Sequence, residues 1–207
     1  MTQRSGNATG TARIWLRATP LVAALALGGC IGIGGGNKPP MRLLRFTSAQ
    51  TAPAGSALSG NATDAIIVFD PETDRRLAVT RVAVQVDATN VAYLKDTAWV
   101  DRPAHLFSML LTETIRAGGK HMAFSSDSGV VAVGSRLHGD LLDCGYDARE
   151  RAVVVRYDAV WTAPGGKVMT KRFEAKVAGV APKPDKIAPA LNKAANDVAA
   201  QVAEWLG

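Results

Sequence analysis

The stretch VVVRYDAVWTAPGGKVMTKRFEAKV, residues 153–177, decides the fold of this 207-residue chain. Apolar side chains recur at every second position of residues 153–161 and again of residues 169–177, which is the period of a strand with one buried face. Between the two runs lies APGG, residues 163–166, a sequence typical of a tight turn. Lys171 is the exception on the apolar side. The stretch predicts an antiparallel hairpin within a meander of strands over residues 130–177.

Shorter segments nearer the N-terminus predict more strands. Residues 41–46 are a candidate first strand, whereas residues 47–63 are rich in Ala, Ser, Gly and Thr and predict a loop. The continuous apolar run IIVF at residues 66–69 stops at Asp70-Pro71, as expected of a strand buried on both faces. Residues 81–87 alternate, with Val82, Val84 and Val86 on one side, and predict a half-buried strand. Val91 and Tyr93 extend the sheet after a turn at Thr89-Asn90.

Two segments have the spacing of amphipathic helices. In the first, Asp101 is the expected cap, Pro103 fits the first turn, and Gly118-Gly119 ends the helix. Its apolar stripe consists of Phe107, Leu110, Leu111 and Ile115. The second stripe consists of Leu191, Ala195, Val198, Val202 and Trp205.

The start of the C-terminal helix has two candidates. Asp185 is a suitable cap, but Pro189 would then lie just past the tolerant first turn, so a start at Pro189 is the alternative. The order of strands and helices predicts an α+β fold, a mainly antiparallel, mixed sheet with two amphipathic helices packed on one face.

The N-terminus predicts a lipoprotein signal peptide that ends at Cys30. Arg13 and Arg17 form a positive region, residues 21–27 are apolar, and small residues precede the cysteine in LGGC. An uncleaved transmembrane helix is the alternative, but spanning takes about 20 apolar residues, and glycines interrupt the run from Gly28. We predict a signal peptide over residues 1–29, lipidation of Cys30, a Gly/Pro tether over residues 30–40 and one periplasmic domain over residues 41–207.

The charge balance argues against nucleic-acid binding. The chain has 24 Lys and Arg and 18 Asp and Glu, a net charge of +6. The predicted signal peptide holds three of the arginines and no acid, so the mature chain has 21 basic and 18 acidic residues, a net charge of +3. Binding to phosphate backbones needs clustered Lys and Arg, and the sequence has no such run.

Cys144 has no partner for a disulfide once Cys30 is lipidated. It is either a small buried apolar residue or an exposed thiol. Because free cysteine is usually buried, we predict burial, and stability must come from packing rather than from a disulfide.

Candidates for metal or acid/base chemistry are few. The three histidines are scattered, and the spacing of His138 and Cys144 matches no common metal motif. Asp140 and Asp143, three residues apart on a strand, are expected on opposite faces, which is wrong for joint acid/base work. Ser108 and the serines at positions 125, 126 and 128 lack a Gly-x-Ser-x-Gly context. We therefore expect no enzymatic activity, no metal and no cofactor.

Trp99 has two interpretations, because tryptophan serves both cores and interfaces. As a core residue it would pack against Leu106 and Leu110 at the start of the helix, and its truncation would mainly destabilise the fold. As an interface residue it would lie beside two charged neighbours in a short connection. We predict a protein interface formed by Trp99, Asp101 and Arg102.

The chain resembles the ABC-type transport auxiliary lipoproteins. The similarity rests on the lipoprotein signal and tether, and within residues 65–207 most distinctively on YLKDTAWVDRPAHL, residues 93–106, which follow the matching Val91 and Ala92. Four shorter segments also match: residues 66–68 with Pro71, residues 81–84, Gly166 with Val168, and residues 173–175. Residues 191–205 are similar to the closing helix of the family.

This resemblance implies a non-enzymatic periplasmic lipoprotein that docks on an MCE-domain protein served by an inner-membrane ABC transporter, in a system that moves lipids between membranes. Ile31 stands where an aspartate favours inner-membrane retention in many enteric bacteria, so the outer membrane is the implied location and the inner membrane the alternative. Two other interpretations stay open, a domain that itself binds lipid and a structural envelope lipoprotein unconnected to transport. The sequence also leaves a homo-oligomer open.

Overall fold

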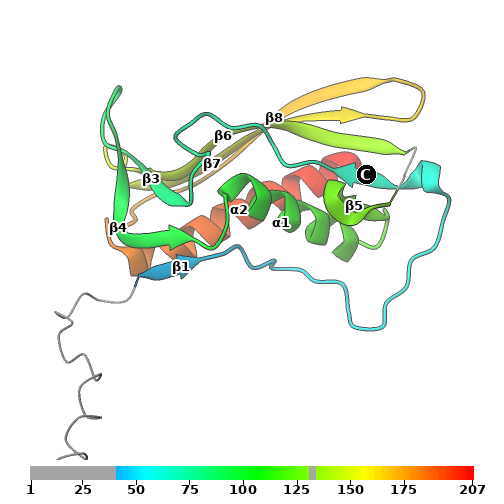
Figure 1. Cartoon of the computed structure of the whole chain (residues 1–207), viewed down its shortest axis with the longest axis horizontal. Coiled ribbons are helices and arrows are strands. Elements are labelled where there is room, and N and C mark those ends of the chain that lie inside the picture. The colour runs from blue at the N-terminus through cyan, green and yellow to red at the C-terminus, as the bar shows by residue number, and fades with distance from the viewer. Residues whose placement is uncertain (1–40, 131–133) are drawn as a thin grey trace, which may run out of the picture. The chain divides into compact units, whose positions relative to one another are not determined.

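The computed structural model describes residues 41–130 and 134–207, so the predicted signal peptide, Cys30 and the tether lie outside the described residues. The described residues form an eight-stranded mixed sheet and two long helices, which confirms the predicted α+β class (Figure 1). The elements are, in chain order, β1 Arg42–Leu44, β2 Ile66–Val68, β3 Arg81–Gln85, β4 Val91–Trp99, α1 Pro103–Ala117, β5 Ala123–Ser125, β6 Ser135–Asp147, β7 Ala152–Thr162, β8 Val168–Val177 and α2 Pro184–Leu206. Short 3-10 turns occupy Ala62–Asp64 and Ser126–Ser128.

The hairpin predicted from residues 153–177 is the β7–β8 pair. The two strands are antiparallel from the pair Val153 and Val177 to the pair Thr162 and Val168. Gly165 and Gly166 of the turn have φ angles of 87° and 86°, a region that only glycine adopts without a steric penalty. The expected inward side chains of β7 are buried, and Trp161 is partly buried. β6 pairs with the other edge of β7 and completes the antiparallel meander.

β6 also divides the sheet into two wings. Its beginning pairs in parallel with β2, and its end pairs in parallel with β3. β5 continues the first wing, while β4 and then β1 continue the second. At the crossing of β3 and β6, a Cβ on Gly145 would lie 2.5 Å from the backbone oxygen of Ala83. Glycine is therefore required where these two strands approach.

A β-bulge at Leu142 corrects one prediction. Leu141 pairs with Tyr157 and Asp143 with Arg156, so β6 has one extra residue between these pairs. The extra residue shifts the alternation of side chains, because Leu141 and Cys144 both end up inward at 1% exposure. Asp140 and Asp143 consequently share the outward face, and the prediction that they point to opposite faces is wrong.

The two strands predicted from residues 66–69 and 81–87 form as β2 and β3, with one difference in burial. All three residues of β2 are buried, as predicted. In β3, Val82 and Ala83 are both buried, whereas Val86 lies beyond the strand and is 43% exposed. The cause is a register shift against β4 between Arg81 and Ala83, so the simple alternation predicted for this segment is wrong.

Helix α1 has the predicted core stripe and C-terminus but a different N-terminus. Its four predicted apolar residues are all buried, and Gly119 has a left-handed φ of 68°. The residue before the helix is Arg102, whose side chain makes no capping bond. The Asp101 carboxylate accepts from the Arg102 backbone N–H at 2.6 Å rather than from the first turn, so Asp101 as the helix cap is wrong.

Helix α2 begins earlier than expected, at Pro184, with Lys183 before it. Pro184 occupies the tolerant first turn, and Pro189 lies inside the helix. Both expected starts, a cap at Asp185 and a beginning at Pro189, are therefore wrong. The predicted apolar stripe is correct, because its first four residues are fully buried and Trp205 is partly buried.

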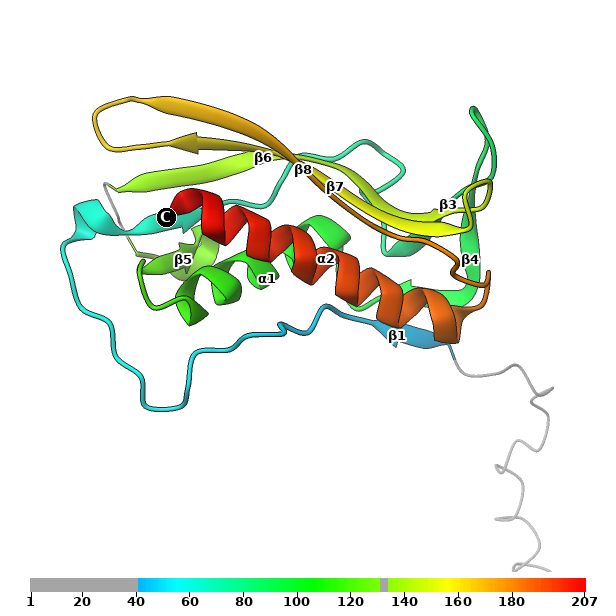
Figure 2. The ribbon, with the colours of Figure 1, turned by 180° about the vertical axis from the view of Figure 1, so that it is seen from behind.

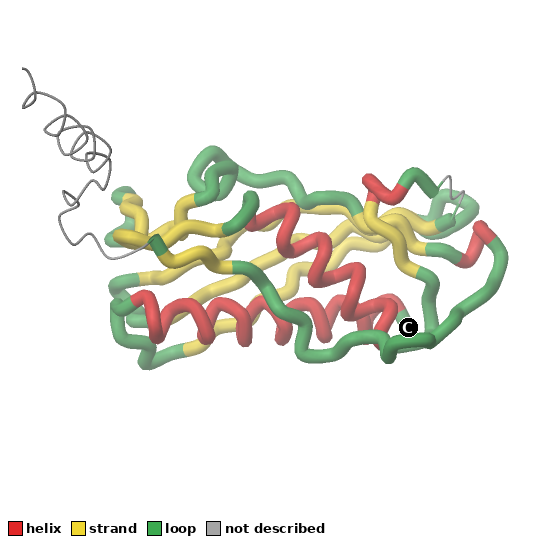
Figure 3. The backbone as a smooth tube through the Cα atoms, turned by 60° about the horizontal axis from the view of Figure 1, so that its bottom comes forward, coloured by secondary structure: helices red, strands yellow, loops and turns green. Residues whose placement is uncertain are grey.

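The two helices cover one face of the sheet and leave its other face open (Figures 1 and 2). α2 packs on β7 and β8, and α1 packs on α2 and on the wing formed by β2 and β5. The helices cross the sheet next to one another (Figure 3). Aromatic rings join the layers: Phe107 of α1 meets Tyr157 edge-on at 5.3 Å, and Trp205 of α2 meets Phe173 at 5.6 Å.

Among the residues that the structure describes, neither α1 nor α2 has the length and apolar character required to cross a bilayer.

Candidate functional site

The open face of the sheet contains a groove of about 800 Å³ between β3, β6, β7 and the loop of residues 71–80. Ala83, Gly145 and Val154 contribute small or apolar surface to it. Ten charged side chains also line this sheet groove, five acidic and five basic, so its formal charge is balanced. They are Asp74, Asp143, Asp147, Glu150, Glu174, Arg75, Arg76, Arg149, Arg156 and Lys176.

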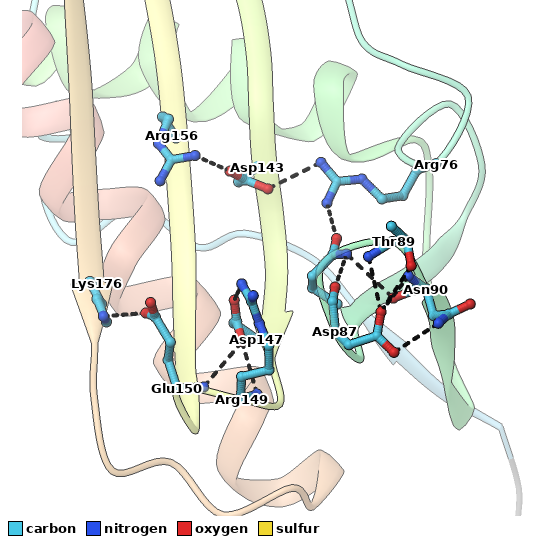
Figure 4. A network of polar contacts seen from close by, with 11 residues as sticks. Arg76, Asp87, Thr89, Asn90, Asp143, Asp147, Arg149, Glu150, Arg156 and Lys176 are labelled. Carbon is cyan, nitrogen blue, oxygen red and sulfur yellow. Dashed lines mark hydrogen bonds and ion pairs between the residues drawn. The ribbon is translucent and has the colours of Figure 1, made fainter.

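Asp143 lies at the centre of the groove between two arginines (Figure 4). One carboxylate oxygen lies 3.1 Å from Nη2 of Arg76, and the other lies 2.5 Å from Nη1 of Arg156. The three side chains are 25%, 19% and 34% exposed, respectively, so solvent screens these contacts only in part. Arg76 also donates to the backbone oxygen of Leu142 at 2.7 Å, which fastens the 71–80 loop to the β6 bulge.

Further ion pairs surround this centre. Arg156 contacts Glu174 of β8 at 2.5 Å, and Lys176 of β8 contacts Glu150 of the β6–β7 turn. Asp147 accepts from the Arg149 side chain at 3.2 Å. Partial burial opposes ionisation of Asp147, but the side-chain hydrogen bond from Arg149 and two backbone hydrogen bonds together lower its pKa. Nine of the ten charged side chains of the groove, all but Arg75, are thus in ion pairs with one another.

The turn between β3 and β4 is held rigid beside this groove. The Asp87 carboxylate accepts from the side chain of Asn90 at 2.8 Å and from the backbone N–H groups of Thr89 and Asn90, both at 2.9 Å (Figure 4). The Asn90 side chain and these backbone donors stabilise the ionised form and lower the pKa of Asp87 to about 2.

Part of this site was predictable and was missed. Arg156 occupies an outward position of the alternating stretch, and Glu174 is its register partner across the β7–β8 hairpin. The outward positions of the period-two pattern, which hold the polar side chains, therefore predict that Arg156 and Glu174 lie side by side. Arg76 lies in a loop, and no local pattern indicates that it reaches Asp143.

The structure separates the three residues of the predicted interface. Trp99 is a core residue, 3% exposed, with its ring 4.9 Å from that of Phe46. Its Nε1 is buried without a partner among the described residues. Asp101 and Arg102 are exposed. A partner can thus contact Asp101 and Arg102 on this folded surface but not the indole of Trp99.

A serine, an aspartate and a histidine do meet at the start of α1. Ser108 Oγ lies 2.5 Å from Asp70 Oδ1, and His105 Nδ1 lies 3.1 Å from Asp70 Oδ2. Here the carboxylate is in the middle, whereas a hydrolytic triad places the imidazole between serine and carboxylate. Ser108 is also only 1% exposed. The cluster ties the end of β2 to α1 and lacks the order needed for nucleophile activation.

His138 and Cys144 do not form a joint site, because His138 is exposed and Cys144 is 1% exposed. The burial predicted for Cys144 is correct, and that burial, with the nearby charge of Asp143, raises the pKa of the thiol to about 12. Over residues 41–130 and 134–207, no three side chains of the His, Cys, Asp and Glu types gather closely enough to hold a metal ion.

Comparisons with known proteins establish a shared fold. Neither a family model nor a curated protein sequence matches the chain. An uncharacterized protein of known structure has a TM-score of 0.63 at 10% identity, covering 82% of this chain and 100% of its own. A Xanthomonas campestris protein of the DUF330 family has a TM-score of 0.62 at 13% identity, covering 81% and 92% of the two chains. The chain therefore has the fold seen in a DUF330 protein.

A weaker likeness concerns PelC from Paraburkholderia phytofirmans, whose structure is a dodecamer. It has a TM-score of 0.40 at 16% identity and covers 72% of this chain and 92% of its own. This score is too low for the assembly of that protein to bear on this one.

Proposed function

We propose that this protein is a lipid-anchored periplasmic accessory component of an ABC/MCE-type intermembrane lipid transport system, and that it acts by docking rather than by catalysis. The observation that carries the proposal is the combination of a lipoprotein signal ending at Cys30, a tether of about ten residues and an α+β domain with a DUF330-like fold. The resemblance of residues 65–207 to the auxiliary lipoproteins supports the same role. That resemblance also supports an outer-membrane anchor.

The sheet groove is the proposed docking surface. Its charges are held by neighbouring strands, as in the contact of Arg156 on β7 with Glu174 on β8, so the pattern exists before a partner arrives. Complementary charges across an interface mainly provide specificity and fast association. A rigid pattern of both signs suits recognition of a polar partner surface such as that of a folded protein.

A charge swap tests this surface without removing an ion pair. Exchanging Lys176→Glu together with Glu150→Lys keeps the contact between β8 and the β6–β7 turn but inverts the pattern that a partner meets. The matched control exchanges Arg172→Asp and Asp158→Arg, a cross-strand pair of β8 and β7 that lies outside the lining of the groove. We expect both swapped proteins to unfold at the wild-type temperature, and only the groove swap to lose co-purification with a co-expressed MCE-domain protein from the same organism.

Equal binding by both swapped proteins would remove the groove from the proposal. Arg102→Glu then tests the other surface, since the Arg102 side chain is exposed. If this variant alone loses the partner, docking occurs at the predicted Asp101 and Arg102 surface. If no MCE-domain protein co-purifies with the wild type, the transport role itself is refuted.

Direct lipid binding is a second candidate function, favoured by one observation. A groove of about 510 Å³ lies between the segment that follows β8 and the first half of α2, and its lining is mostly apolar, with Lys186 and Lys193 as its charged residues. An acyl chain with an anionic headgroup fits such a lining. Mass spectrometry of noncovalent lipid retained by the purified protein tests it, and Lys186→Glu with Lys193→Glu should lower the amount retained. Unchanged retention in that double variant would count against this groove.

A further inference from the structure

β1, the strand that follows the predicted tether, has an unusually apolar exposed edge. Met41 is 64% exposed and Leu43 is 63% exposed, among the highest values for large apolar residues of the described chain. Arg42 and Arg45 are exposed as well. Residues 41–46 contain these two basic residues and no acidic one.

The register of β1 places these side chains on one surface. β1 pairs in parallel with β4, Leu43 beside Ala98 and Leu44 beside Trp99. Side chains alternate along a strand, and Leu44 and Phe46 pack against the core, so Met41, Leu43 and Arg45 share the outward face. Val100, 51% exposed, follows on the β4 side, where its N–H donates to the Leu44 oxygen at 2.9 Å. Arg42 alternates to the other side of the strand but is exposed as well, and its long side chain can bring the guanidinium to the same boundary. We call this surface, with Arg42, the β1 edge.

The length of the tether indicates what covers the β1 edge. Ten residues separate Cys30 from Met41, and ten residues reach at most roughly 35 Å when fully extended. β1 is thus the described element nearest in sequence to the predicted lipid anchor. Exposed apolar side chains beside arginines match the boundary between headgroups and acyl chains, where apolar groups are buried and guanidinium groups bind phosphate.

We propose that the folded domain makes a second contact with the membrane through the β1 edge. Met41, Leu43 and Val100 enter the headgroup region, while Arg42 and Arg45 bind the phosphates of anionic lipids. This inference rests on the proposed function through the Cys30 anchor. A single lipidated residue on an extended tether leaves the orientation of the domain on the membrane unrestricted. A second contact at β1 restricts that orientation and therefore how the domain presents its sheet groove to a partner.

The test uses the mature lipidated protein with a fluorophore at Leu43→Cys. The introduced thiol is labelled selectively, because the Cys30 thiol is blocked by lipid and Cys144 is buried. The matched control is Val168→Cys, which replaces a residue of similar exposure, 57%, beside the β7–β8 turn. That turn lies at the opposite end of the sheet from β1 (Figures 1 and 2).

Both labelled proteins are reconstituted into phosphatidylglycerol-containing vesicles that also carry a nitroxide-labelled lipid. We expect quenching of the label at position 43 and none at position 168. Replacing Arg42→Gln and Arg45→Gln should lower the ratio of docked to free domain by roughly 30-fold, at about fivefold for each basic residue near an anionic surface. Vesicles of phosphatidylcholine alone should give a similar loss.

The outcomes separate the second contact from the anchor. Protein that stays on the vesicles without quenching at position 43 overturns the second contact and leaves the anchor intact. Protein that does not stay on the vesicles refutes the anchor, and the inference fails with it. A label at position 43 that becomes shielded in lipid-free detergent as the protein concentration rises shows that a second copy covers the β1 edge, which also overturns the proposal.

Discussion

Truncation of Trp99 is the perturbation that best tests how this domain is built. The side chain is 3% exposed, and its ring packs at a tilt against that of Phe46 with the centroids 4.9 Å apart, so this contact helps to hold the segment after β1 against the end of β4. Removing a buried tryptophan side chain costs about 3–5 kcal/mol of unfolding free energy. In a domain of this size 1 kcal/mol corresponds to about 2–4 °C. Trp99→Ala should therefore lower the melting temperature by about 6–20 °C.

Circular dichroism during thermal unfolding measures this loss of stability. Two further variants serve as controls. Trp99→Phe keeps an aromatic ring against Phe46 and deletes Nε1–H, which has no partner among the described residues, so it should cost clearly less than alanine. Arg102→Glu changes an exposed side chain and should stay within about 0.5 kcal/mol of the wild type.

The result that refutes this reasoning is a Trp99→Ala protein that unfolds at the wild-type temperature. If that protein also lost its partner, Trp99 would be an interface residue after all, and the packing of Phe46 on Trp99 would be wrong. If binding falls only in step with unfolding, the core role stands.

Three other outcomes are expected. Cys30→Ser should abolish acylation by mass spectrometry and shift the protein out of the outer-membrane fraction; an acylated, membrane-bound variant would refute the anchor. Cys144 should resist alkylation in the native state and react in denaturant, because burial raises the pKa of its thiol to about 12; rapid native alkylation would contradict this. The pKa of Asp87 falls on folding from 3.8 to about 2, so its ionised form stabilises the native state above pH 3.8, and this contribution is lost as the pH falls toward 2. Asp87→Ala should thus be less stable than the wild type at neutral pH, with the difference vanishing near pH 2 in denaturant titrations; a difference that does not change with pH would contradict the role of the carboxylate.

The elements that sequence predicts well here are those whose side-chain period is undisturbed. Val153, Val155 and Tyr157 alternate without interruption, and the stripe from Leu191 to Val202 follows a helical period throughout. Each pattern indicates directly which face of its strand or helix is buried in the core. The fold class follows from these buried faces, because two apolar helix faces and one apolar sheet face must cover each other.

The features that the sequence did not predict depend on contacts between residues far apart in the chain. The bulge at Leu142 comes from fitting β6 against β7, and nothing in the neighbouring residues distinguishes Leu142 from an ordinary strand position. The short strand β5 is stabilised by pairing with β2, far away in sequence, and was not predicted. Arg76 reaches Asp143 across 67 residues of chain. The sheet groove depends on all of these contacts, so most of the candidate site could not be read from local patterns.

The charged side chains at the centre of the groove suit the docking role proposed above. Arginine is the cation on both sides of Asp143, and guanidinium keeps its charge at every pH at which proteins fold. General acid and base catalysis needs a group that gains and loses a proton near the working pH, and neither arginine does so. What Arg76 and Arg156 provide instead is fixed geometry, because each donates to a separate oxygen of one carboxylate. In the proposed docking role, the placement of these charges would determine which partner surface binds. The swap of Lys176 with Glu150 is therefore the decisive perturbation, since it changes that placement while the number of charges and ion pairs stays constant.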